Sequence, residues 1–159
     1  MRKGLISILF LALALPCFAG PSSEQERNKN VAKNFFEDVL SRGQLDKYAE
    51  FHSKDFVAHA GDRTATLEED LAYAREERRA LPDMSFRVNR IVAESDLVAV
   101  HFTVSGTNTQ AGMGFPATGK KIASDGVTIF RFKDGKICEE WSVFDMLTVM
   151  KQAGLFPQP

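Results

Sequence analysis

The chain has 159 residues, of which 44% are hydrophobic and 26% charged, as in an ordinary globular protein of one domain. Its formal net charge of −1 excludes the basic surplus of a nucleic-acid-binding protein, so no nucleic-acid partner is expected. The 13 phenylalanines would suit a core or a pocket with aromatic walls.

Residues 1–19 have the three-part layout of a secretory signal peptide. "MRK" is a short cationic start, "LISILFLALAL" is an apolar run, and "PCFAG" supplies small residues, with cleavage expected after Ala19. The apolar run is short for a membrane span, so we expect a periplasmic or secreted protein with no stable membrane insertion after cleavage. A retained N-terminal anchor and lipidation at Cys17 are the alternatives. In the mature chain only Cys138 remains, and it is expected to be a small buried residue.

Two amphipathic stretches predict helices at the start of the domain, after a flexible polar lead at 20–27. Residues 31–40 place their apolar side chains on one helical stripe, and Gly43 is suited to end that helix. A second short helix is expected at 45–51. The alternating segment 55–61 is expected to be a brief strand.

A third helix is expected to begin at Thr66 and to stop before Pro82. Glu69 lies three positions after Thr66, which is the pattern of a capping box. The charges at 75–79 are expected to form its solvated face. A last short amphipathic helix is expected to begin at Met146.

From Ser85 onward the apolar residues recur with a period of two. This pattern predicts four successive strands, "SFRVNRIVAE", "DLVAVHFTVSGT", "KIASDGVTIFRF" and "GKICEEWSVFD". Asp134 and Gly135, between the last two, favour a two-residue hairpin turn. Helices followed by a meander of strands predict a single α+β domain over residues 28–156, with the helices on one face of an antiparallel sheet.

The hairpin sets a strand register on which the first candidate site depends. A two-residue turn without a bulge places Trp141 opposite Thr128 and Ile137 opposite Phe132. One sheet face then collects an aromatic and apolar set that ends in an ionisable carboxylate: Phe130, Phe132, Ile137, Trp141, Val143 and Asp145. A bulge would flip the outer half of the last strand.

Asp145 is the first candidate for chemistry. At the end of an aromatic-walled face, its carboxylate would lose hydration, which would raise its pKa toward neutrality and suit a general base. The alternative is that Asp145 caps the helix that begins at Met146.

The three histidines differ in their expected surroundings. His59, on the short strand, is the second catalytic candidate, as a hydrogen-bond partner of a carboxylate or a substrate oxygen, or else a structurally satisfied histidine. His101 lies on the polar face of its strand and is a weaker candidate. His52, which follows a helix, is expected to be solvated.

Several familiar site types are missing from the sequence. It contains no phosphate-binding glycine loop in the required context, no zinc-ligand spacing and no serine nucleophile elbow. Any catalysis is therefore expected to be acid–base chemistry without a metal or another cofactor.

Four segments together resemble the SnoaL-like polyketide or ester cyclase family of the nuclear-transport-factor-2-like superfamily. They are "FFEDVLSRGQLDKYAEFHSKDFVAHAG", "LPDMSFRVNRIVAESDLVAVHFTVSGT", "FPATGKKI" and "IFRFKDGKICEEWSVFDML…QAG". They occur in the family's order and cover essentially all of residues 28–156. The sequence departs from many relatives at Asn108, where they carry histidine.

The resemblance implies a cone-shaped α+β fold in which a curved sheet wraps over helices to enclose a deep apolar cavity. It implies ring closure by an aldol reaction with an aspartate as acid/base and no metal. Asp145 matches that aspartate, His59 matches a histidine of the family, and Trp141 would line the cavity beside Asp145. We expect the remaining substrate contacts to come from Phe36, Phe130, Phe132 and His101.

These observations favour an exported cyclase- or isomerase-like enzyme for a small apolar carbonyl compound. Asp145 would remove a proton α to the carbonyl, and His59 would donate a hydrogen bond to the developing oxyanion. One alternative is a non-catalytic binding module for a small apolar ligand. Another is an interaction domain, since superfamily members commonly form homodimers through their sheets, and a homodimer is expected here as well.

Overall fold

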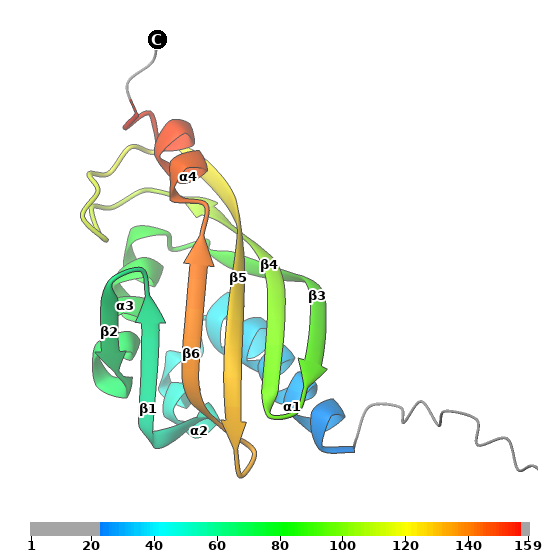
Figure 1. Cartoon of the computed structure of the whole chain (residues 1–159). Coiled ribbons are helices and arrows are strands. Elements are labelled where there is room, and N and C mark those ends of the chain that lie inside the picture. Colours follow the sequence, from blue (N-terminus) through cyan, green and yellow to red (C-terminus); the bar gives the residue numbers. More distant parts are fainter. Residues whose placement is uncertain (1–22, 157–159) are drawn as a thin grey trace, which may run out of the picture.

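A computed structural model describes residues 23–156, so the expected signal peptide lies outside the described residues. Figure 1 shows the helices and strands in chain order. Their bounds are α1 (Ser23–Asn34), η1 (Phe35–Ser41), η2 (Leu45–Lys47), α2 (Tyr48–Phe51), β1 (His52–Ala60), β2 (Arg63–Thr66), α3 (Leu67–Ala80), β3 (Ser85–Glu94), β4 (Leu97–Thr107), β5 (Lys121–Lys133), β6 (Lys136–Phe144) and α4 (Met146–Ala153).

The strands form one curved sheet in the order β2-β1-β6-β5-β4-β3 (Figure 1). Neighbouring strands are antiparallel, except for the parallel pair β1 and β6. Helices α1 and α3 cover one face of the sheet, and α4 packs at one end beside β5 (Figure 1). This arrangement confirms the predicted α+β fold. No helix in the described part of the chain is long and apolar enough to cross a membrane.

The N-terminal helix begins earlier than the sequence predicted. Residues 23–27, which were assigned to the flexible lead, belong to α1. The chain then continues into η1, a π-helical segment that buries Phe35, Phe36 and Val39 against the sheet. Gly43 follows with a φ of 69°, a left-handed conformation that a side chain would disfavour.

The predicted capping box at the start of α3 is present. The Glu69 backbone N–H donates to Thr66 Oγ1 at 3.4 Å, and the Thr66 N–H donates to Glu69 Oε2 at 2.8 Å. Two backbone donors at the helix start are thereby satisfied. The box fixes where α3 begins, and thus which α3 residues face β1 and β2.

The predicted turn between β5 and β6 is also present, but a bulge changes the register beyond it. Asp134 and Gly135 both have positive φ, at 52° and 75°, as a tight hairpin turn requires. Cys138, which is only half-buried, is the extra residue of the bulge. Glu139 pairs with Arg131 on the far side of it.

Beyond the bulge, each side chain of β6 points to the opposite sheet face from the one predicted. Trp141 pairs with Ile129 and not with Thr128, so it lies on the sheet face turned away from the helices. The expected alignment of Trp141 with Phe130 and Phe132 is therefore wrong. Glu140 and Ser142 take the inward positions instead.

Gly126 on β5 lets an aromatic ring approach the sheet. A Cβ atom at this position would lie 2.5 Å from Phe102 Cζ and 3.2 Å from Phe144 Cδ1. Because real Cβ atoms do not come this close to other atoms, the packing of both rings depends on the missing side chain.

Candidate functional site

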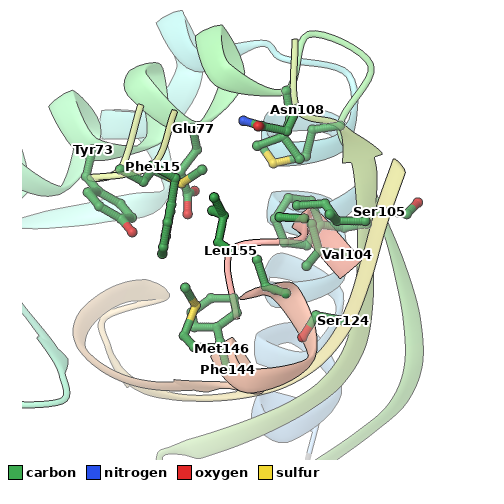
Figure 2. Close-up of a pocket in the computed structure, with 17 residues that line it drawn as sticks. Tyr73, Glu77, Val104, Ser105, Asn108, Phe115, Ser124, Phe144, Met146 and Leu155 are labelled. Carbon is green, nitrogen blue, oxygen red and sulfur yellow. The ribbon is translucent and has the colours of Figure 1, made fainter. Parts of the chain in front are cut away.

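A cavity with two adjoining chambers lies between the sheet and the helices. The first, which we call the apolar chamber, has a volume of about 90 Å³ (Figure 2). Its walls come from α3, strands β3 to β6, the loop after β4, and α4. They are mostly apolar and include Leu81, Met84, Val104, Phe115, Ile122 and Val149.

The second chamber, which we call the acidic chamber, has a volume of about 70 Å³. Three carboxyl groups contribute to its lining, from Asp70, Glu77 and Glu140. Four residues line both chambers, so the two adjoin directly: Tyr73, Glu77, Phe86 and Phe144.

Glu140 is the acid of β6 that lines the acidic chamber. The Ser142 hydroxyl donates to Glu140 Oε1 at 2.6 Å, and the Ser142 and Thr128 hydroxyls are hydrogen-bonded at 2.7 Å. Burial raises the pKa of Glu140 well above its ordinary value, and repulsion from Asp70 raises it further. A carboxyl group in this environment retains its proton under conditions in which an exposed glutamate has lost it.

Asp70 is held by Tyr48 across the acidic chamber. The Tyr48 hydroxyl donates a hydrogen bond to Asp70 Oδ2. Burial raises the pKa of Asp70, although this hydrogen bond and the charge of Arg63 oppose the rise. Burial and then the Asp70 charge raise the pKa of Tyr48, so its hydroxyl remains a donor.

Glu77 and Tyr73 project from α3 toward the junction of the chambers. Figure 2 shows the Glu77 carboxyl and the Tyr73 ring turned toward the same hollow. Burial, followed by repulsion from Asp70, raises the pKa of Glu77 to about 7. The expectation that the charges at 75–79 face solvent is therefore wrong for Glu77.

Arg78 also differs from the prediction that the charged residues 75–79 are solvated. Its guanidinium donates to the backbone carbonyls of Leu40, Ser41 and Met84 and so ties α3 to η1 and to the start of β3. The positive charge of Arg78 is thus held by backbone carbonyl oxygens near Glu77.

Asp145 lines neither chamber of the cavity. It is exposed and caps α4: the Thr148 N–H donates to its Oδ1 at 3.0 Å, and the Thr148 hydroxyl donates to its Oδ2 at 2.6 Å. These two hydrogen bonds lower the pKa of Asp145, the hydroxyl contributing more. The expected raised pKa is therefore wrong, and the capping alternative describes the observed geometry.

His59 and Trp141 lie together on the outer face of the sheet. Their rings stack at 5.5 Å with an interplanar angle of 12°, and His59 Nε2 lies 3.0 Å from Glu139 Oε1. The Arg131 guanidinium carbon lies 5.2 Å from the centre of the Trp141 ring. Trp141 therefore lines neither chamber, whereas His59 also contributes to the lining of the acidic chamber that holds Asp70, Glu77 and Glu140.

The other histidines also differ from their expected positions or roles. His101 lies in an open groove on the outer face, 3.9 Å from an Asp125 carboxylate oxygen, and Asp145 lines the same groove. His52 is buried rather than solvated, and its Nδ1 lies 2.8 Å from the Tyr48 carbonyl oxygen.

Two of the predicted aromatic contacts do lie at the cavity. Phe36 and Phe130 line the acidic chamber, where their rings lie 6.0 Å apart. Phe132 packs beside Phe130 in the buried core and does not line either chamber.

The acids that line the acidic chamber are not among the site residues predicted from the sequence, although the sequence contains a partial signal for them. Asp70, Tyr73 and Glu77 follow one another at helical spacings of three and four, which places them on one face of α3. Glu140 had no comparable signal, because its inward direction depends on the bulge at Cys138.

Asn108 holds the loop that forms one wall of the apolar chamber. Its Oδ1 accepts hydrogen bonds from the Thr118 N–H at 2.8 Å and from the Thr118 hydroxyl at 3.0 Å. Its side-chain amide donates to the Gln110 carbonyl at 3.1 Å. Asn108 is thus a buried structural anchor of this loop.

A curved sheet wrapped over helices around an internal pocket defines a nuclear-transport-factor-2-like domain of the small-molecule-binding kind. The sequence profile of the SnoaL-like polyketide cyclase family matches residues 30–153, and the chain belongs to that family. The family and the fold predicted from the sequence are thus confirmed. No match was found among curated proteins.

Solved structures of similar proteins support the same assignment. AclR of Streptomyces galilaeus, a proposed hydroxylase, is 27% identical with a TM-score of 0.77, covering 84% of this chain and 89% of its own. IdmH of Streptomyces antibioticus, a proposed polyketide cyclase, is 27% identical with a TM-score of 0.71, covering 80% and 98%. A proposed SnoaL-like polyketide cyclase from Jannaschia sp. CCS1, at 21% identity and a TM-score of 0.80, covers 87% and 99% and shows the shared fold.

Proposed function

We propose that this protein is a cofactor-independent acid–base enzyme of the cyclase or isomerase type, acting on a small carbonyl compound in the two-chamber cavity. The observation that carries the proposal is the Glu140 carboxyl, which lies in a chamber walled by aromatic rings and has a strongly raised pKa. Carboxyl groups with a pKa close to the working pH are the ones suited to move protons.

In the proposed reaction Glu140 takes the place that the sequence suggested for Asp145. The ionised Glu140 carboxylate removes a proton α to the carbonyl, and the C–H electron pair becomes the new C=C bond of an enolate. The hydroxyl of Tyr73, which lines the same chamber, donates a hydrogen bond to the developing oxyanion. In a cyclase the enolate carbon then attacks a second carbonyl of the substrate, and the oxygen of that carbonyl takes the proton from Glu140. In an isomerase the enolate is conjugated with a neighbouring C=C bond, and a different carbon of the conjugated system takes the proton from Glu140.

Ser142 acts as the positioning residue for this acid. Its hydrogen bond to Oε1 orients the carboxyl and leaves Oε2 available for the substrate. Phe36 and Phe130 exclude water from the chamber, which keeps the pKa of Glu140 high.

The test follows proton exchange and needs no knowledge of the natural substrate. Cyclohexanone and acetophenone are incubated with the protein in deuterated buffer, and deuterium at the α-carbon is followed by NMR. We expect exchange above the buffer rate with the native protein and a loss of that excess in Glu140→Gln. Exchange that is equal in the two proteins would refute the role of Glu140.

A non-catalytic binding module is the second candidate function. The mostly apolar walls of the first chamber favour it, because such surfaces bind apolar ligands without any chemistry. This function predicts ligand binding without α-proton exchange, and it predicts only a mild change in affinity in Glu140→Gln.

We also propose that two copies associate through the outer face of the sheet. Exposed apolar side chains gather there, with Val143 at 72%, Val127 at 42% and Ile129 at 37% exposure. Apolar surface of this kind on a sheet face is suited to an interface. Light scattering would show a dimer that dissociates in Val143→Glu, whereas a monomeric native protein would refute the proposal.

Export to the periplasm or the medium remains our proposal for the location of the protein. It rests on the charge and hydropathy pattern of residues 1–19. Intact mass measurement of the protein from its host is expected to give an N-terminus after Ala19. A mass that retains the initial residues would contradict cleavage.

A further inference from the structure

The Glu77 carboxyl is a buried acid that the proposed reaction does not use. It lines both chambers and is largely enclosed, and Figure 2 shows it directed into the hollow. Among the described residues, none donates a hydrogen bond to this carboxyl or forms a salt bridge with it. A buried acid without a protein partner is costly, so it calls for a reason.

The charges around Glu77 leave the cavity short of cations. Asp70 and Glu140 face the same chamber. Of the two nearby guanidiniums, that of Arg78 donates to backbone carbonyls, and that of Arg63 lies 4.3 Å from the centre of the Tyr73 ring. Neither guanidinium pairs with Glu77, so a positive charge from a ligand would be favoured at this point.

The walls next to Glu77 are suited to a cation with an apolar body. Tyr73, Phe86, Phe115 and Phe144 contribute aromatic rings at or beside the apolar chamber. Aromatic faces attract ammonium groups, and the attraction is strongest where water is excluded. The two chambers together are similar in size to a ~150 Å³ cavity that accommodates benzene.

We infer that the ligand of this cavity carries a protonated amine that binds to Glu77, while its apolar part fills the apolar chamber. The inference rests on the proposed function in that it takes this cavity as the ligand site. It then specifies the substrate class as an amine-bearing carbonyl compound. A metal ion is a poor alternative occupant, since no three His, Cys, Asp or Glu side chains among residues 23–156 are placed so that they could hold one together.

The test compares two probes of the same shape, benzylamine and benzyl alcohol, by calorimetric titration near neutral pH. We expect benzylamine to bind at least about tenfold more tightly, because only its ammonium group pairs with Glu77. This preference should disappear in Glu77→Gln and persist in Glu140→Gln. The second variant separates the inference from the proposed function, since it should lose proton exchange and keep the preference for the amine.

Proton release provides a second readout on the unaltered protein. With a pKa of about 7, Glu77 is partly protonated near neutral pH, so benzylamine should displace up to about half a proton and benzyl alcohol none. The titratable and charged groups around Glu77 are Asp70, Tyr73, Glu76, Glu140, Arg63 and Arg78, and Glu77→Gln isolates the contribution of Glu77.

Equal binding of the two probes, or no measurable binding of benzylamine at millimolar concentration, would overturn the inference. A preference for benzylamine that survives in Glu77→Gln would overturn the assignment to Glu77. If α-proton exchange fails while the amine preference holds, the proposed chemistry falls and the inferred ligand class stands. If exchange occurs without the preference for benzylamine, the proposed chemistry stands and the inferred ligand class falls.

Discussion

Replacing Glu77 by Gln should stabilise this protein at neutral and alkaline pH and leave it unchanged in acid. Gln has nearly the same shape as a protonated Glu but carries no charge to be buried. Burial and the Asp70 charge raise the pKa of Glu77 from an ordinary 4.5 to about 7. In the native protein the folded state therefore binds more protons than the unfolded state between pH 4.5 and about pH 7.

The sign and the magnitude of the effect follow from this difference. Where the folded state binds more protons, the free energy of unfolding falls as pH rises. A change in pKa from 4.5 to about 7 corresponds to about 3 kcal/mol, since each unit is worth about 1.4 kcal/mol. Glu77→Gln should thus match the native protein at pH 4.5 and exceed its stability by up to about 3 kcal/mol at about pH 8.

Urea unfolding of the native protein and the variant at a series of pH values would measure this difference in the free energy of unfolding. The comparison between the two proteins is necessary, because His52 contributes with the opposite sign. Burial lowers the pKa of His52 to about 4, so its contribution is lost as pH falls from 6.5. His52 is present in both proteins, and its effect cancels in the difference.

Glu94→Gln provides the control, because Glu94 is an exposed carboxyl at the end of β3. As a substitution at an exposed surface position, it should change the free energy of unfolding by no more than about 0.5 kcal/mol. If Glu77→Gln were as stable as the native protein at every pH, or less stable at about pH 8, the Glu77 carboxyl would not be buried as described.

Three further predictions concern the cavity and its surroundings. Because the pKa of Glu140 is raised, its ionised form appears only at higher pH, so kcat/KM for α-proton exchange should rise with pH across the neutral range. A flat profile above pH 5 would exclude Glu140 as the base. Asp145→Asn should retain full exchange activity, since Asp145 is an exposed helix cap and Asn is an equally good one; a large loss of activity would return the acid/base role to Asp145. Gly126→Ala should destabilise the protein by about 1–3 kcal/mol in urea unfolding, because the new methyl group would overlap the Phe102 ring; an unchanged midpoint would show that the ring has room to move.

The sequence by itself determined the features that depend on neighbours along the chain. The Thr66–Glu69 capping box and the Asp134-Gly135 turn both formed as predicted, because each needs residues only a few positions apart. The period-two pattern from Ser85 onward likewise predicted the strands of the meander. Family membership followed from the order of such local motifs.

Only the tertiary structure decided which side chains share the cavity. One extra residue at Cys138 reverses the strand beyond it, which turns Trp141 outward and Glu140 inward. A local alternating pattern is the same on either side of such a bulge, so it carries no sign of the reversal.

The pKa values of the acidic residues likewise could not be predicted from the local sequence. For Asp145 the sequence left open a base in an apolar setting or an exposed helix cap, and the structure shows the cap. For Glu77 the sequence predicted a solvated position, and the structure places it at the cavity. A pKa depends on the water removed by all surrounding groups, and at Glu77 these come from a helix, several strands and a distant loop. Contacts between such distant segments are specified by the whole fold, so no short stretch of the chain encodes them.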